Sequence, residues 1–524
     1  MKFRNTRQHR VAQVSATALS LVAATALLAG CASSDPTASS DPSSGSASKK
    51  TSLTVAIGSD VVSLDPQLQG DLTSMSVADN IFDTLTVRGA DNELHPGIAT
   101  KWKQKDPLTW EFTIRKGVEF QNGEKLDAEA VAFSINRLLD PATKSPIVEL
   151  VNVKSAVAVN PTTVDFQMKA TDPVIPAKVS LFGGVIVPPK LITEEGAEAF
   201  AKHPVGSGPY SFVSRSQAES IVLKANPHYW GAKPAVKNLT FKIMPNPASA
   251  LAALQSGEAD IVTGITKDAA NQLGTSTDTT VKSTAGIRTY DLSIDTITDG
   301  PLANADVRKA LNEAVDVPTL ISTVMAGAAK QTPTLVPSSV YGFDASVKPF
   351  PYDVKDAKAL LKKAGYAKGF STTLSASSAD SALAQAIAGQ LGKIGVTAKV
   401  AVVDPQTAKS EIITLNKRRD GGLYLMANSG WTLDSVSFLQ SVVKSDRRSS
   451  RWNNPEADQL IVAGETGTVP ATRLKTFSTM QKLLKSEAPF VYLFNVNNTY
   501  ALRSTVKWTM PVTGILNMST ATVK

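Results

Sequence analysis

The chain has 524 residues, too many for a single hydrophobic core and enough for two or three lobes. Its net charge is +8, but four cations lie within residues 1–10, and without them the charge is about +4. So mild an excess over so large a body argues against a nucleic-acid partner. The single cysteine, Cys31, excludes an internal disulfide.

The amino terminus predicts export. Residues 1–10 carry cations and no acid, and an Ala/Leu-rich apolar run follows from Val11 to Leu28. The run ends in Leu28-Ala29-Gly30-Cys31, which resembles a lipobox, in which the thiol is acylated and the chain is cut before it. We therefore expect a signal peptide at 1–30, lipidation of Cys31, and a place on the outer face of the bacterial cytoplasmic membrane. A membrane-spanning anchor is the alternative, since about 18 apolar residues approach the spanning minimum.

Residues 31–50 predict a disordered tether. After Cys31 they are rich in Ser, Pro, Asp and Ala and contain no large apolar side chain, so they cannot bury enough surface to offset the entropy of ordering. A coil of this composition spans roughly 25 Å. We expect it to keep a folded body close to the membrane and free to reorient.

The first half of that body is rich in strand patterns. Alternating apolar residues predict strands at 53–57, 110–114, 164–168 and 239–243. Between the second and third of these, Asp127 is placed to cap a helix that stops near Pro141.

The second half alternates between helices and strands. Apolar spacing predicts a helix at 307–315, capped by Asn304 or Asp306, and another that starts after Asp353 and ends at Gly365. A strand at 371–375, a helix at 382–393, and strands at 396–403 and 423–426 follow. The pattern predicts an α/β protein with more than one lobe.

Ordered segments along nearly the whole chain resemble one family, the extracytoplasmic solute-binding proteins of family 5, which serve peptide/nickel-type ABC importers. The segments are SLDP (63–66), IFDTLTVRGADNELHPGIATKWKQKDPLTWEFTIRKGVEFQNG (81–123), PVGSGPYSF (204–212), NPHYWG (226–231), LAALQSGEADI (251–261), VRKALNEAVD (307–316), YDVKDAKALLKKAGY (352–366), NNPEADQLI (453–461) and PFVYLF (489–494).

This resemblance implies a two-lobed clamshell of the type II periplasmic-binding-protein class, with an extra small domain inserted in the N-terminal lobe. Transferred to this chain, lobe I comprises 51–86, 204–300 and 495–524, the inserted domain 87–203, and lobe II 301–494. The implied role is a monomeric substrate-binding component that passes a solute, most simply an oligopeptide, to ABC permease subunits with a cytoplasmic ATPase. The alternatives are an oligosaccharide, opine or metal-chelate ligand, or a surface or signalling lipoprotein with the same fold.

The candidate ligand site follows the strand at 423–426. Ligands of open α/β sheets bind at the carboxyl ends of strands, and here the chain continues as Ala-Asn-Ser-Gly-Trp-Thr-Leu-Asp. The stretch 431–434 resembles the "W-T-G-D" of peptide-binding members, whose aspartate pairs with the ligand's amino group, although Leu433 departs from it. We therefore predict that Ser429, Trp431 and Asp434 bind ligand. The alternatives are a helix N-cap for Asp434 and core packing for Trp431.

Other motifs favour neither an enzyme nor a metal site. Neither Gly-x-Ser-x-Gly nor His-Glu-x-x-His is present, and the three histidines after Cys31 (His95, His203 and His228) lack ligand spacing. We expect no cofactor. Residues 206–209, Gly-Ser-Gly-Pro, predict a tight turn rather than a phosphate loop. The basic clusters at 417–419 and 447–451 predict solvated loops, with an anion pocket as the alternative.

Overall fold

The computed structural model describes residues 51–524 apart from 90, 275, 405–420 and 448–449. The largest sheet in these residues has the strand order β10-β11-β12-β1-β13-β19-β14-β18-β16-β17, with β15 paired to β19. Its strands are β10 (Tyr210–Ser216), β11 (Ser220–Ala225), β12 (Asn238–Ile243), β1 (Ser52–Ile57), β13 (Ile261–Thr263), β19 (Phe490–Arg503), β14 (Thr279–Ile294), β18 (Leu423–Ser429), β16 (Phe370–Ser377), β17 (Val396–Val403) and β15 (Ala329–Gln331).

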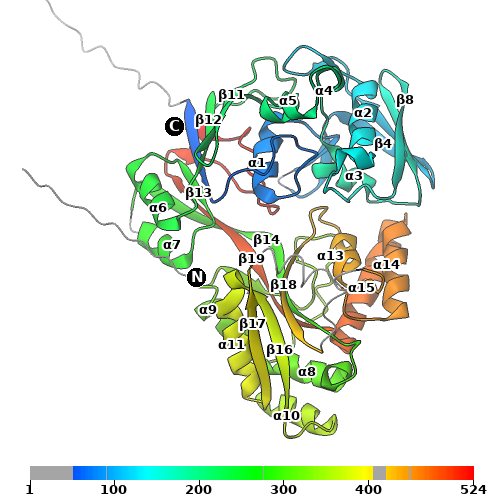
Figure 1. Ribbon diagram of the computed structural model, residues 1–524, viewed down its shortest axis with the longest axis vertical. Helices are drawn as coiled ribbons and strands as arrows, with labels where there is room; N and C mark the ends of the chain where they lie inside the picture. Colours follow the sequence, from blue (N-terminus) through cyan, green and yellow to red (C-terminus); the bar gives the residue numbers. More distant parts are fainter. Residues whose placement is uncertain (1–50, 90, 275, 405–420, 448–449) are drawn as a thin grey trace, which may run out of the picture. The chain divides into compact units, whose positions relative to one another are not determined.

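Two long antiparallel strands, β14 and β19, join the two halves of this sheet, as Figure 1 shows. On one side, β12, β1 and β13 run parallel to one another, and β13 pairs with β19. On the other side, β18 pairs with β14, and β18, β16 and β17 are mutually parallel. Both halves therefore present the carboxyl ends of parallel strands, where α/β proteins bind ligands.

Helices cover both faces of the β14–β18–β16 half, as an α/β architecture requires. One apolar cluster joins the sheet to α8 (Ala305–Ala314), α10 (Val354–Lys363) and α11 (Ser381–Gly392) through Leu311, Leu361 and Ile387. A second cluster on the opposite face joins it to α13 (Ser435–Val442), α14 (Pro455–Thr466) and α15 (Pro470–Glu487) through Phe438, Ile461 and Phe477.

A separate small sheet lies within residues 87–203. Its strand order is β4 (Ala99–Asp106), β5 (Thr109–Ile114), β9 (Thr163–Met168) and β8 (Val153–Asn160), all antiparallel. Helix α2 (Ala128–Leu139) packs on β8 and β9. The other helices and strands between residues 72 and 202 are α1 (Leu72–Ile81), β2 (Thr86–Arg88), β3 (Leu94–Pro96), β6 (Val118–Glu119), β7 (Lys125–Leu126), α3 (Ile175–Lys178), α4 (Pro189–Glu195) and α5 (Ala197–Lys202).

The caps read from the sequence are confirmed where they lie next to strong helical patterns. Asp127 accepts the backbone N–H groups of Glu129 and Ala130 at the start of α2. Of the two candidates for α8, Asn304 is the cap, since it accepts the N–H of Asp306. Asp353 caps α10, and Gly365 just beyond that helix has the positive φ of 87° that glycine tolerates without strain.

The turn at 206–209 lies against the end of α1 rather than around a phosphate. A Cβ atom at Gly206 would collide with the carbonyl oxygen of Ile81, and the N–H of Gly208 donates to that oxygen at 2.9 Å. Ser207 donates to Asp83 at 2.8 Å. The two glycines therefore allow close backbone approach, which explains the tight turn that the sequence predicts.

The predicted signal peptide, Cys31 and the tether lie outside the described residues. Within the described part of the chain, no helix is both long enough and apolar enough to cross a membrane. The lobe boundaries given above stay predictions. The remaining helices are α6 (Pro247–Ser256), α7 (Lys267–Leu273) and α9 (Val317–Thr323), and β20 (Val506–Lys507) and β21 (Thr522–Val523) form a separate antiparallel pair.

Candidate functional site

The predicted ligand loop leaves the end of β18 and enters α13. The strand runs three residues further than expected, through Ser429, because 427–429 pair with β14 up to Arg288. The loop then turns tightly, with the N–H of Leu433 donating to the carbonyl of Gly430 at 3.1 Å. Tyr341 fixes it from the side, donating its N–H to Leu433 at 2.9 Å and accepting the N–H of Ser435 at 3.0 Å.

Leu433 adopts a left-handed backbone conformation with φ of 55°. Such a conformation costs a residue with a Cβ roughly 1–2 kcal/mol, whereas glycine adopts it freely. The leucine side chain is buried in the cluster around α13 and α15, which offsets this cost. Leu433, which replaces the glycine of the "W-T-G-D" pattern, therefore has a backbone conformation that glycine would adopt without strain.

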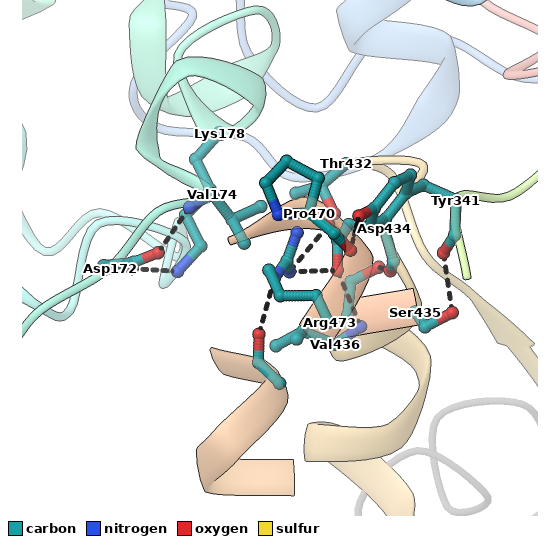
Figure 2. Close-up of polar contacts among 12 residues, drawn as sticks. Asp172, Val174, Lys178, Tyr341, Thr432, Asp434, Ser435, Val436, Pro470 and Arg473 are labelled. Atoms are coloured by element: carbon teal, nitrogen blue, oxygen red, sulfur yellow. Dashed lines mark hydrogen bonds and ion pairs between the residues drawn. The ribbon is translucent and has the colours of Figure 1, made fainter. Parts of the chain in front are cut away.

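Asp434 lies at the N-terminus of α13 and is 6% exposed. Its Oδ1 accepts the N–H of Val436 at 3.0 Å, so it is the N-cap. In addition, Nη2 of Arg473 donates to Oδ1 at 3.0 Å and to Oδ2 at 2.9 Å (Figure 2). Both the capping role and an ion pair are therefore present at the predicted amine anchor, and a ligand-binding role stays a prediction.

Trp431 and Ser429 flank this carboxylate along the chain. The Trp431 ring lies edge to face with Phe182, with centroids 5.8 Å apart. It is partly buried between two apolar clusters, one that contains Phe182 and one around α13 to α15. Ser429 ends β18 opposite Arg288 and is half-buried. Core packing therefore accounts for part of the Trp431 side chain, while the rest stays accessible.

Residues of the 87–203 segment reach the same loop. Arg88, at the end of β2, donates from Nη2 to the carbonyl oxygen of Thr432 at 2.6 Å. Asn152 donates to Glu465 of α14 at 3.2 Å and to Asp172 at 3.1 Å. These contacts join the segment that carries the small sheet to the segment that carries α13–α15.

A second buried ion pair lies beside the first. Nζ of Lys178 donates to Oδ2 of Asp172 at 2.5 Å, and both side chains are almost fully buried. In Figure 2 this pair lies to the left of Arg473 and Asp434. Each of these two pairs joins opposite charges, as buried charges require.

Burial is the largest influence on Asp434, and it raises the pKa of this carboxyl. The Arg473 guanidinium and the N–H of Val436 lower the pKa, and the negative charge of Asp172 raises it further. The ionised form therefore depends on the arginine.

Sequence reasoning missed Arg473, Arg88 and Lys178. For Arg473 a signal existed, because it shares the helical face of Phe477, Met480, Gln481 and Leu484, all buried in α15. A cation on an apolar helix face needs a buried partner. For the other two no local pattern indicated a role.

The carboxyl ends of β1 and β13, in the other half of the sheet, line a cavity of about 230 Å³ whose walls also include the apolar residues Leu72, Met510 and Leu516. It is lined by Gly58, Thr73, Ser76, Asn497, Asn498 and Thr499, among others. The amide and hydroxyl groups that line it suit the backbone or polar groups of a small solute.

The prediction of a solvated loop for the basic cluster at 447–451 is wrong for Arg451. Arg451 is 2% exposed, and its guanidinium carbon lies 3.7 Å from the ring centroid of Tyr424. It is therefore a core residue, because the aromatic ring and nearby acids compensate its burial. The cluster at 417–419 lies outside the described residues. No group of three or more His, Cys, Asp and Glu side chains that could hold a metal occurs among the described residues.

Comparisons with known proteins agree with this architecture. Residues 93–450 match the model of the bacterial extracellular solute-binding proteins, family 5. The glutathione-binding protein GsiB of Escherichia coli strain 536 is 28% identical over 517 residues, covering 95% of this chain and 96% of that protein.

Among solved structures, the periplasmic binding protein DppA from Helicobacter pylori in complex with the peptide STSA is 26% identical, with a TM-score of 0.76. The alignment covers 91% of this chain and 98% of DppA. The substrate-binding protein CtaP from Listeria monocytogenes, at 22% identity, has a TM-score of 0.82 over 91% of this chain and 100% of its own, a likeness of fold alone.

These matches confirm the predicted α/β fold of the type II clamshell class. The family consists of transport binding proteins, not enzymes. The model match covers more than half of the residues, so the chain belongs to family 5 of the bacterial extracellular solute-binding proteins.

Proposed function

We propose that this protein captures an oligopeptide outside the membrane and delivers it to the permease of an ABC importer. Family membership supports a solute-binding role. The relatives support the ligand class, because glutathione and STSA, named for GsiB and DppA, are both short peptides. The ligand-binding residues that we propose are Ser429, Trp431 and Asp434.

The observation that carries this proposal is the remaining acceptor capacity of Asp434. Each carboxylate oxygen accepts about two hydrogen bonds. Among the described residues, Oδ1 accepts from Val436 and Arg473, whereas Oδ2 accepts only from Arg473. By this count Oδ2 can accept one more hydrogen bond, which we propose comes from the ligand's ammonium group. A charged amine in a dry cleft needs such a partner, since unpaired burial costs several kcal/mol.

Trp431 and Ser429 would hold the rest of the peptide. The accessible part of the indole offers a flat apolar surface for a side chain. Ser429 ends an antiparallel strand pair, where the hydroxyl and backbone can hydrogen-bond an extended ligand.

The transport cycle follows from differential binding. A peptide that touches both the Ser429–Asp434 loop and the segment carrying Arg88 and Phe182 stabilises the state in which these approach. A ligand shifts such an equilibrium only by the difference between its affinities for the two states. We propose that the permease recognises this closed surface.

Lipidation of Cys31 would hold the protein at the membrane. Durable anchoring needs at least two acyl chains, which a diacylglyceryl group supplies. Replacing Cys31 by Ser should abolish labelling with radioactive palmitate and leave residues 1–30 attached to the chain. Continued labelling of Cys31→Ser would contradict the anchor.

A thermal-shift screen with peptides tests the ligand class. A ligand at 100 times its Kd adds about 2.7 kcal/mol of stability, which is readily seen. Asp434→Asn should weaken binding of peptides with free amines and leave their N-acetylated forms unaffected. Asp446→Asn is the control, because that side chain is 65% exposed. If no peptide shifts the unfolding of the wild-type protein, peptide capture is wrong.

A further inference from the structure

Arg473 is held in place by four separate contacts. Its Nε donates to the carbonyl of Gly464 at 2.8 Å, and its Nη2 bonds both oxygens of Asp434. The guanidinium carbon also lies 5.2 Å from the ring centroids of both Tyr341 and Phe477. The side chain is 10% exposed. An arginine fixed in this way loses little further freedom when its partner engages a ligand.

The same contacts fix the carboxylate. Asp434 is tied to the backbone of α13 through Val436, and its loop is tied to Tyr341, whose hydroxyl donates to the carbonyl of Pro470 at 3.0 Å. Pro470 is the first residue of α15, three residues before Arg473. The helix that carries the guanidinium is thus linked to the loop that carries the carboxylate, and Figure 2 shows these groups together.

Among the charges around Asp434, Arg473 is the main one that favours the ionised carboxylate. Arg473 of α15 and Arg88 of β2 favour its ionised form, whereas Asp172, itself paired with Lys178, disfavours it. Tyr341 also faces the pair, and its own raised pKa keeps it neutral in the physiological range. Without Arg473, burial would favour a protonated carboxyl, which cannot pair with an ammonium ion.

We infer that Arg473 is a positioning residue for ligand recognition: it keeps Asp434 ionised and oriented, so that the open position on Oδ2 binds the ligand's amine. This inference rests on the proposed function, and it assigns to Arg473 no contact with the ligand. The effect of Arg473 should be limited to peptides with a free amine, because a peptide without one gains nothing from an ionised Asp434.

The pH dependence of affinity distinguishes this role from a structural one. For wild type, the affinity for a free-amine peptide should change less between pH 5.5 and pH 8 than it does in Arg473→Met, because the guanidinium opposes the effect of burial on Asp434. In Arg473→Met it should fall 10- to 100-fold at pH 5.5 and recover as the pH rises and Asp434 ionises. The N-acetylated peptide should bind both proteins equally at every pH. Isothermal titration calorimetry on the full mature chain measures all of these values.

Two further variants keep the test decisive. Arg473→Lys retains the charge and should keep the pH profile of wild type, and it replaces the methionine variant if that one fails to fold. Arg473→Met in an Asp434→Asn background should bind like Asp434→Asn alone, because the arginine acts only through the carboxylate.

The outcomes separate the two proposals. If Arg473→Met weakens both peptides equally, or without dependence on pH, Arg473 is structural and the inference is overturned. A pH-dependent loss in Arg473→Lys as large as in Arg473→Met also overturns it. If wild type binds neither peptide, the proposed function itself fails and takes this assignment with it.

Discussion

Arg88 and Thr432, 344 positions apart in sequence, are joined by a hydrogen bond of 2.6 Å from a guanidinium to a backbone carbonyl. A second guanidinium nitrogen of Arg88 donates to the carbonyl of Asn92 at 2.6 Å, which holds the side chain in place. The bond links the segment with the small sheet directly to the ligand loop.

Arg88→Met should therefore weaken solute binding. A hydrogen bond from a charged donor contributes about 1.5–3 kcal/mol, which corresponds to roughly a 10- to 100-fold loss of affinity if the bond forms as the two segments approach. Lys101→Met, an exposed lysine in the same segment, is the matched control. Calorimetric titration with a peptide that wild type binds measures the Kd of both variants. An unchanged Kd in Arg88→Met would mean that the bond does not stabilise the ligand-bound state.

The backbone conformation of Leu433 predicts that the glycine variant at this position is more stable than the alanine variant. Leu433→Ala and Leu433→Gly both remove a buried side chain, at a cost of about 2–5 kcal/mol. At φ of 55°, however, glycine is relaxed and alanine is strained, so the glycine variant should be the more stable by about 1 kcal/mol.

Leu439 gives the control for that order. It is a buried leucine inside α13, where glycine is about 1 kcal/mol less favourable than alanine. Leu439→Gly should therefore be the less stable of its pair. Urea denaturation of the four variants tests the inversion, and the same order at both positions would refute strain at Leu433.

The burial of Asp291 predicts that the stability of the folded protein depends on pH. It lies in β14, fully buried, accepts a hydrogen bond from Asn428 at 2.8 Å, and its Oδ1 has no hydrogen-bond partner among the described residues. Burial raises its pKa to about 8, although Asn428 and Arg451 act in the opposite direction. The folded protein thus keeps a proton that the unfolded chain releases near pH 4.

The sign follows from linkage. Because the pKa of Asp291 is higher in the folded state, its contribution to stability is complete below about pH 4 and is lost as the pH rises toward 8. Asp291→Asn does not titrate, so its stability relative to wild type should rise by at least about 1 kcal/mol between pH 5.5 and pH 8. Denaturation curves at both pH values measure this. Asp446→Asn should show no such trend, and a constant difference for Asp291→Asn would contradict the raised pKa.

Local sequence patterns predicted much of the fold, and the reason is visible at particular residues. Asp127 and Asp353 cap their helices because the cap bonds N–H groups only two or three residues away. In strand β5, Trp110, Phe112 and Ile114 are buried and the residues between them are half-buried, so the sequence itself shows the two-residue period of a strand. Length and local pattern indicated more than one lobe, and the family resemblance added the clamshell arrangement of those lobes.

The candidate site was only half predictable. Asp434 and Trp431 stand in a recognisable motif, but the partner of Asp434 lies 39 residues away on α15, and Arg88 lies on a different segment altogether. Such pairings depend on how helices and strands pack. Nothing in the sequence shows the positive φ of Leu433 either, because leucine is uncommon in that conformation and does not signal a turn.

Two glycines should respond to alanine in opposite ways. Gly206 lies against the end of α1, where a Cβ atom would overlap the carbonyl of Ile81, so Gly206→Ala must displace backbone and should cost more than about 2 kcal/mol. Gly389 lies inside α11 with nothing within 4 Å of an added Cβ, so Gly389→Ala should stabilise the protein by about 0.5–1 kcal/mol, the helix preference of alanine over glycine. Urea denaturation midpoints measure both. A neutral Gly206→Ala would show that the turn at 206–209 can move away from α1, and its tight packing would then not be what requires glycine there.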